Sequence, residues 1–431
     1  MKLLLNLPHL ILLNTIILQN PAFANAKAQK IKHNRNRIKF TPPSPLIQVS
    51  HAINTSTNTN AQDTPVSDTF QTRRTASTTY QPIRIKFHTD PILAAIQDAD
   101  TLTKARGNAI ITHVLPEIEA IWSQSLSVIR SDNNLVLPSN VCFDLYEFPE
   151  EWSKPAIGVS ETDLVIFVSA LKFIGTTELC SNNAALSTLA VSSPCAVDPV
   201  TDRPVVGFAN VCLNTLAMGT NGEVDEESIR TMVDVMSHEL VHVLGLNSEL
   251  YKYFRNSRTG KPLTPRKENF LGKGMGFSIT DNVPCVNGQN KRDMALACDN
   301  TVRYAEESVK YGDGNVKRGY YEVVTPTVVQ VARNHFNCQD LSGARLENQP
   351  TSEDCIGSHF DERTWFTEFM SAVYDEDAAF FSPLTLAFLE DTGWYKSDFR
   401  YAENSPFGIF AGCPFVEENC IVNQEVPGKK P

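Results

Sequence analysis

The sequence lacks an excess of positive charge and, beyond its N-terminus, any long apolar run. Its 431 residues include 38 Lys and Arg against 49 Asp and Glu, a formal net charge of −11. A chain this acidic is a poor candidate for binding nucleic acid or an anionic membrane. No later stretch reaches the roughly 18 unbroken apolar residues of a transmembrane helix. No internal repeat is present, and the 42% apolar composition excludes a disordered or collagen-like chain for the bulk of the sequence.

Cysteine is absent before Cys142, whereas the rest of the chain contains ten. Whether these cysteines are paired depends on the compartment, which the N-terminus indicates. Residues 1–26 contain an interrupted apolar run, Leu3–Leu18, and then an A-x-A pattern at Ala22–Ala24 or Ala24–Ala26. This arrangement is typical of a cleaved secretory signal, with an uncleaved anchor as the alternative. Secretion places the cysteines in an oxidising compartment, where we expect five disulfides.

Residues 27–80 lack apolar periodicity and contain very few acidic residues. They are rich in Ser, Thr, Asn and Pro and carry a net charge of +6, whereas the chain from residue 81 onward carries −18. A basic, unstructured segment ahead of an acidic body is typical of a pro-segment that lies on the body by charge attraction. Arg73-Arg74 is then a candidate processing site. The alternative is a solvated linker with no inhibitory role.

The ordered body begins near residue 81 and shows the patterns of an α+β or α/β fold. The expected elements are a half-buried strand at 83–87, a helix over 102–130 with a kink or start at Pro116, buried strands at 164–168 and 205–211, and an amphipathic helix over 225–244. Gly245 is a natural stop for the last helix. This order predicts a mixed sheet packed on the long helix.

The long helix contains His238-Glu239-Leu240-Val241-His242. Histidines at i and i+4 project from one face of a helix, so both imidazoles can bind a single Zn²⁺. Glu239 follows the first histidine, and from there its carboxylate can reach a metal-bound water without occupying a ligand position. Zinc lowers the pKa of that water toward about 7, and the carboxylate can take its proton as the water attacks a peptide carbonyl. The alternative is an ordinary helix with two unrelated histidines.

A third protein ligand is missing from this helix. Gly245 stands where the motif HExxHxxGxxH turns, but the position of the last histidine in that motif is Ser248. The only histidines farther along the chain are His335, in a helix expected over 325–336, and His359, in a loop. The residues alone leave both open as the third ligand.

Further segments occur in the order typical of one known family. The sequence resembles leishmanolysin, a metzincin zinc peptidase in which a long insertion separates the glycine turn from the third histidine. The matching segments are 202–212, 238–245, 335–338, 357–360, 368–370 and 387–395. The resemblance covers about residues 81–408, most of the body.

The resemblance implies that His238, His242 and His359 bind one zinc ion and that Glu239 is the general base. It implies that Met370 forms a Met-turn, whose thioether packs beneath the imidazoles without binding the metal. The implied protein is a zinc endopeptidase that acts on proteins or peptides. The alternatives are a weak or inactive peptidase-fold protein used for adhesion or binding, and a zinc hydrolase of non-peptide substrates. The presence of Glu239 together with all three histidines favours the peptidase.

The sequence departs from the family in its pro-segment and its tail. Because residues 27–80 have no cysteine to mask the zinc, we expect weak latency. Because the tail is polar and has no GPI signal, we expect secretion, with retention at the cell surface or in a secretory compartment as the alternative. The expected organisation is a signal (1–26), a pro-segment (27–80), an N-terminal catalytic subdomain (81–250), an insertion (251–340), and a C-terminal subdomain (341–431) below the cleft that supplies the third ligand and the Met-turn.

Overall fold

The fold is seen in a computed structural model, which describes residues 14–17, 79–138, 141–174, 177–180, 188–266, 276–280, 283–284, 290–291, 295–311, 314–347, 356–372 and 379–418. Almost all of the predicted signal and pro-segment therefore lies outside the described residues. So do Cys285, Cys355, Cys420 and the chain from residue 419 onward.

The largest sheet has five strands in the order β1-β8-β9-β5-β3. Strands β3 (Ile85–His88), β5 (Leu164–Ser169) and β9 (Pro204–Val211) are parallel, whereas β8 (Thr188–Val197) and β1 (Asn14–Ile17) are antiparallel to their neighbours. Every residue of β5 and β9 is buried, as is typical of strands covered on both faces. The predicted strands and the mixed sheet are confirmed, although β8 was not predicted.

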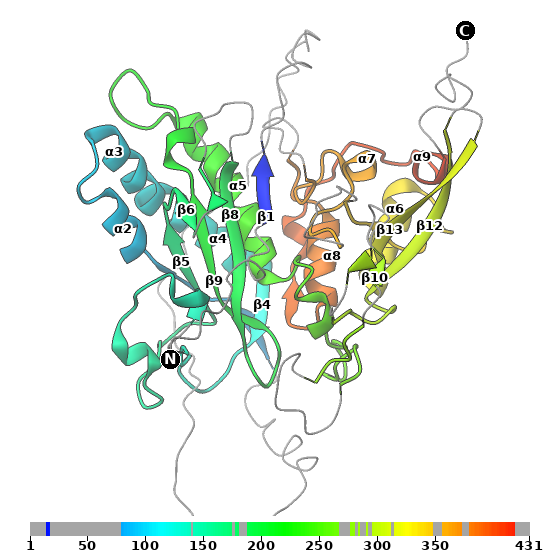
Figure 1. Ribbon diagram of the computed structural model, residues 1–431, viewed down its shortest axis with the longest axis horizontal. Coiled ribbons are helices and arrows are strands. Elements are labelled where there is room, and N and C mark those ends of the chain that lie inside the picture. Colours follow the sequence, from blue (N-terminus) through cyan, green and yellow to red (C-terminus); the bar gives the residue numbers. More distant parts are fainter. Residues whose placement is uncertain are drawn as a thin grey trace, which may run out of the picture.

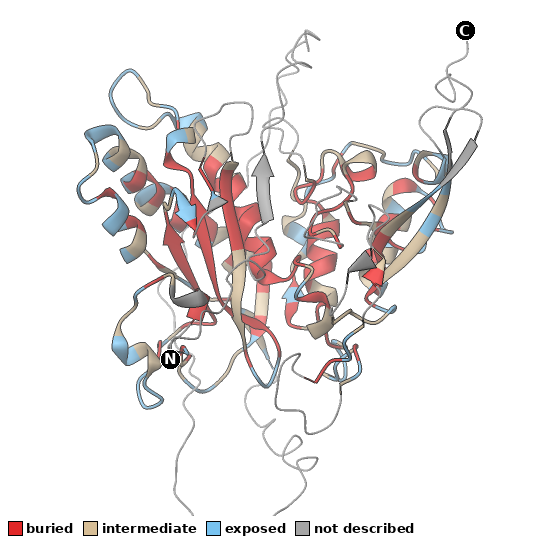
Figure 2. Ribbon diagram, viewed as in Figure 1, coloured by how far each residue is buried: buried red, intermediate tan, exposed pale blue. Residues whose placement is uncertain are grey.

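Helix α5 (Glu226–Leu244) packs against β8 and β9 and corresponds to the long helix predicted from the sequence. Asp225 caps it, because its carboxylate accepts hydrogen bonds from two main-chain nitrogens of the first turn. Its first turns are partly exposed, whereas all residues from Val235 to Leu244 are buried (Figure 2). Gly207 on β9 permits this close packing, since a Cβ at that position would lie 2.4 Å from Cγ1 of Val243.

Three short helices lie between β3 and β5 in the sequence: α2 (Asp90–Ile96), α3 (Thr101–Ala109) and α4 (Leu115–Ser125). A π-helical turn, Ile110–Val114, joins α3 to α4, and β4 (Leu126–Ile129) follows α4 directly. The helix predicted over 102–130, with a kink or start at Pro116, is therefore confirmed in its break, because α4 starts at Leu115. Its predicted end is wrong, because residues 126–129 form β4. Pro116 accounts for the break, because it has no N–H to donate and lies in the first turn of α4.

The C-terminal elements lie together beside the five-stranded sheet (Figure 1). They are the hairpin of β12 (Val302–Tyr311) and β13 (Gly314–Val323), β14 (Ala344–Arg345) beside it, and helices α6 (Pro326–Phe336), α7 (Glu362–Trp365), α8 (Pro383–Asp391) and α9 (Cys413–Glu417). Helix α6 confirms the helix predicted over 325–336.

The chain returns to its first half through a small sheet. Strand β15 (Tyr395–Ser397) pairs with β4, which also pairs with β2 (Tyr80–Pro82). Two further pairs have strands of two residues each: β6 (Phe173–Ile174) with β7 (Thr177–Glu178), and β10 (Val283–Pro284) with β11 (Asn290–Lys291). Within the described ranges, no helix is long and apolar enough to cross a bilayer.

Three disulfides link the described cysteines: Cys142–Cys195, Cys180–Cys212 and Cys338–Cys413. The last joins the end of α6 to the start of α9. Cys298, by contrast, has a free, half-buried thiol that lies 3.5 Å from the hydroxyl of Thr301. The prediction of five disulfides, which requires every cysteine to be paired, is therefore wrong for Cys298.

Candidate metal site

Helix α5 places His238 and His242 one turn apart in its buried half. Both imidazoles are almost completely buried, and their Nε2 atoms are 3.1 Å apart. This separation follows directly from the spacing of four residues, which stacks the two side chains on one face of the helix.

His359 reaches the same point from a distant part of the chain. Its Nε2 atom lies 3.1 Å from Nε2 of His242, and the three histidines form a buried cluster. The segment that carries it is held by main-chain hydrogen bonds: Glu347 N donates to His359 O at 2.9 Å, and Asp361 N donates to Arg345 O at 3.0 Å. His359 therefore lies on a segment that pairs antiparallel with β14 and the residues that follow it.

In each ring the outer nitrogen, Nδ1, lies outside the Nε2 cluster and faces a hydrogen-bond acceptor. Nδ1 of His238 faces the carbonyl oxygen of Phe369 at 2.7 Å, and Nδ1 of His242 faces that of Leu246 at 2.8 Å. Nδ1 of His359 faces Oε1 of Glu347 at 2.8 Å. Carbonyl and carboxylate oxygens only accept, so each Nδ1 carries the hydrogen and each Nε2 presents its lone pair. The three lone pairs converge.

This donor set fits a zinc ion. Two imidazole nitrogens bound to zinc at tetrahedral angles are about 3.3 Å apart. This is close to the 3.1 Å between His242 and each of the other two rings, and all three ligand atoms lie within 4.8 Å of one another. Burial lowers the pKa of His238 to about 3 and that of His242 well below its usual value, so both rings are neutral, as ligands must be. Burial also opposes protonation of His359, but the adjacent Glu347 carboxylate outweighs it and raises the pKa of this ring.

Glu239 is fully buried beside these histidines, and neither of its carboxylate oxygens has a hydrogen-bond partner among the described residues. The hydroxyl of Ser192 on β8 instead donates to the main-chain carbonyl of Glu239 at 2.7 Å. Burial raises the pKa of the Glu239 carboxyl to about 8. An unpaired buried carboxylate is costly, which points to a group that it meets only in the working protein.

Met370 is completely buried. The turn that contains it makes hydrogen bonds to His238 and to the residue after His359. The carbonyl of the preceding residue, Phe369, accepts from His238, and the carbonyl of Met370 accepts from the main-chain nitrogen of Phe360 at 2.9 Å. Glu368 holds the turn, since its carboxylate accepts from the main-chain nitrogen of Met370 and from two hydroxyls of the α8 region, at Ser382 and Thr385.

The alternative ligand His335 lies elsewhere. Its Nε2 atom faces the carbonyl oxygen of Phe407 at 2.8 Å, and its ring packs against Trp365. Ser248, which stands at the histidine position of the shorter motif, donates its main-chain N–H to the hydroxyl of Ser358, next to His359. The sequence did not point to Glu347, which belongs to no recognisable spacing pattern, and it indicated Glu368 only as part of the 368–370 segment, without a role for its side chain.

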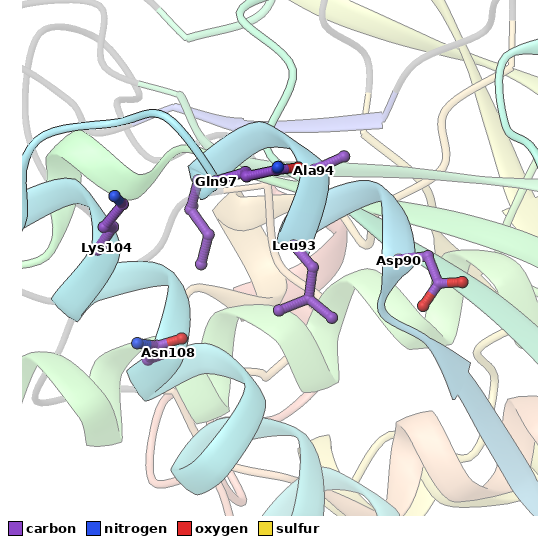
Figure 3. Close-up of a pocket in the computed structure, with 7 residues that line it drawn as sticks. Asp90, Leu93, Ala94, Gln97, Lys104 and Asn108 are labelled. Atoms are coloured by element: carbon purple, nitrogen blue, oxygen red, sulfur yellow. The ribbon is translucent and has the colours of Figure 1, made fainter.

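A surface groove of about 510 Å³ lies between α2 and α3 (Figure 3). It is lined by Asp90, Leu93, Ala94, Ile96, Gln97, Lys104 and Asn108. None of the three histidines lines it, so the groove is no part of the candidate metal site.

Two histidines one turn apart on a buried helix, a third from a distant loop and an adjacent glutamate are the arrangement of a zinc metalloprotease. Comparison with known families agrees, because the model of the leishmanolysin family matches residues 49–292 and 302–426. This chain belongs to the leishmanolysin family.

Individual relatives are similar over much of the chain. A leishmanolysin-like peptidase of Drosophila pseudoobscura pseudoobscura is 28% identical over 390 residues, which cover 81% of this chain and 52% of the relative. One of Caenorhabditis elegans is 31% identical over 268 residues, 61% of this chain and 35% of the relative. Leishmanolysin of Leishmania major is 23% identical over 337 residues, 78% of this chain and 44% of the relative. The matched part of the chain thus spans only about a third to a half of these relatives.

Proposed function

We propose that the protein is a secreted zinc-dependent endopeptidase, in which His238, His242 and His359 hold one zinc ion and Glu239 is the general base. The observation that carries the proposal is the convergence of three Nε2 lone pairs beside a fully buried carboxylate that has no hydrogen-bond partner among the described residues. The disulfides are in keeping with secretion, because such bonds persist in oxidising compartments.

Zinc, when bound by these histidines, would supply a Lewis acid that activates water and polarises the peptide carbonyl. The proton transfers are carried out by a residue of the chain. Glu239 accepts the proton of the attacking water. In the metal-free chain burial favours its protonated form, and a zinc ion at the histidines would favour the ionised form that can act as a base. The same carboxyl can then give the proton to the departing amine, which restores its starting state.

The orientation of the ligands comes from the main chain around them. The carbonyls of Phe369 and Leu246 hold two imidazoles in the tautomer that leaves Nε2 free. Met370 lies in the turn that supplies the first of these carbonyls, and we assign to it the packing role of a Met-turn rather than a place among the ligands.

The test is to measure the zinc content of the purified protein and its cleavage of casein, with and without a chelator. We expect about one zinc per chain and an activity that the chelator abolishes and zinc restores. The Glu239→Gln variant should keep the zinc and lose activity by about 10²- to 10⁴-fold, because an amide cannot accept the proton. The matched control is Glu227→Gln, an exposed glutamate of the same helix, which should be fully active.

A zinc-loaded protein with no proteolysis in any of these assays would contradict the proposal and favour adhesion or binding. Casein cleavage by Glu239→Gln near the wild-type rate would exclude Glu239 as the base.

A further inference from the structure

The third histidine is held differently from the other two. His238 and His242 are fixed by the α5 backbone, and main-chain carbonyls accept from their outer nitrogens. His359 lies outside any helix, and the acceptor for its Nδ1 is the side chain of Glu347, at 2.8 Å. The position of this ligand therefore depends on a residue that can be replaced without changing the main chain.

Glu347 is itself held in place on several sides. Its Oε1 atom also accepts from the main-chain nitrogen of Ser358 at 3.0 Å, and its own nitrogen donates to the carbonyl of His359. Gly357 packs against it so closely that a Cβ there would lie 2.4 Å from Cγ of Glu347. With 15% of its side chain exposed, the carboxylate has little freedom to turn away.

The segment that carries Glu347 is anchored to the β12–β13 hairpin. Strand β14 pairs with β13, and the main-chain nitrogen of Leu346 donates to the carbonyl of Tyr321 at 2.9 Å. On its other side, Leu346 bridges to Phe360. His359 is thus one residue away from the Leu346–Phe360 bridge. The same strand pairing fixes the main-chain position of Glu347.

We propose that Glu347 is a positioning residue, which holds His359 in the orientation and tautomer that bind zinc and so sets the affinity of the site. The inference rests on the proposed function, since it assumes that the three histidines bind zinc. A carboxylate that accepts from the outer nitrogen of a ligand histidine fixes the ring and makes the other nitrogen a better donor to the metal. Glu347 is not part of the three-histidine cluster, so it would act on the metal through His359.

The experiment compares Glu347→Ala and Glu347→Gln with the full-length wild type. Zinc affinity is measured by competition with a chromophoric chelator, and the cobalt-substituted proteins are compared by their visible spectra. Removal of the carboxylate in Glu347→Ala should weaken zinc binding about 10- to 100-fold. Glu347→Gln keeps an oxygen acceptor but loses the charge, so its affinity should lie between those of Glu347→Ala and the wild type, with a cobalt spectrum close to that of the wild type.

Glu322→Gln is the matched control. Glu322 is a buried glutamate on β13 that accepts from Arg303 and Ser342 but touches no histidine. Its loss should reduce stability to denaturant while leaving zinc affinity unchanged. If both Glu347 variants bind zinc within twofold of the wild type, or if Glu322→Gln weakens binding as much as they do, the positioning role is wrong.

The two proposals fail in different ways. A wild type that binds zinc and cleaves casein, beside Glu347 variants of unchanged affinity, overturns only the role of Glu347. A wild type that binds no zinc overturns the proposed function and this inference with it. Should Glu347→Ala not fold, the affinity of Glu347→Gln decides, because equality with the wild type would exclude any effect of the charge.

Discussion

Replacement of Glu239 by Gln is expected to stabilise the metal-free protein increasingly as the pH rises. Burial raises the pKa of this carboxyl in the folded chain to about 8, from a usual value of 4.5. Between these two values the folded protein keeps the proton that the unfolded protein has released. The favourable contribution is therefore complete below about pH 4.5 and is lost as the pH rises through about 8.

The size of the effect follows from the width of that interval. Each pH unit within it lowers the free energy of unfolding of the wild type by about 1.4 kcal/mol relative to a residue that does not titrate. Across the interval the sum is about 5 kcal/mol, an upper limit because local opening that admits water reduces the cost of the charge. Gln resembles the protonated acid in size and neutrality, so the variant should not show this loss.

Urea denaturation at several pH values between about 5 and 8, in excess chelator, measures the difference between the two proteins. The stability of Glu239→Gln minus that of the wild type should increase with pH. Glu227→Gln, whose carboxylate is exposed and paired with Arg230, should show no such increase. If the two curves of wild type and Glu239→Gln run parallel over this range, the Glu239 carboxylate has access to water or a partner and the reasoning is refuted.

Three further changes test the packing around the site. Gly207→Ala should cost about 1–3 kcal/mol by forcing a methyl against Val243; in a double-mutant cycle Val243→Ala should relieve part of that cost, and strict additivity would contradict the contact. Replacing Cys338 and Cys413 by Ala should lower the free energy of unfolding by about 4 kcal/mol, the value for a loop of this length, and an unchanged urea midpoint would contradict it. Glu368→Ala should lower the free energy of unfolding by about 2 kcal/mol or more, because it leaves buried donors around the Met370 turn unpaired. Unchanged stability in urea would show that the turn does not depend on the Glu368 carboxylate.

Local patterns predicted the parts of the structure that local interactions determine. The period of α5, its end at Gly245 and the apolar runs of β5 and β9 are all properties of neighbouring residues, and they lie where the sequence predicted them. The same holds for His238 and His242, whose proximity needs only a helix.

Contacts between distant segments were beyond local reasoning. From residue type alone, His335 and His359 are equally suitable as the third ligand. Only the folded chain shows that His335 faces the carbonyl of Phe407, whereas His359 lies beside the two histidines of α5. Glu347 has no spacing relationship that marks it, because a strand ladder rather than a helix period brings it to His359. The free thiol of Cys298 likewise depends on which cysteines the fold brings within bonding distance.

The small sheet of β15, β4 and β2 has a consequence for biosynthesis. Strand β15 comes near the end of the described chain, yet it completes a sheet with strands from the beginning of the ordered body. A ribosome therefore releases almost the whole body before this sheet can close, and pairings of such long range form slowly. The segments that carry His359 and Met370 also emerge late, so a growing chain lacks at least one of the three histidines until residue 359 has been added. A chain assembled in this order cannot bring the three histidines together until late in its synthesis.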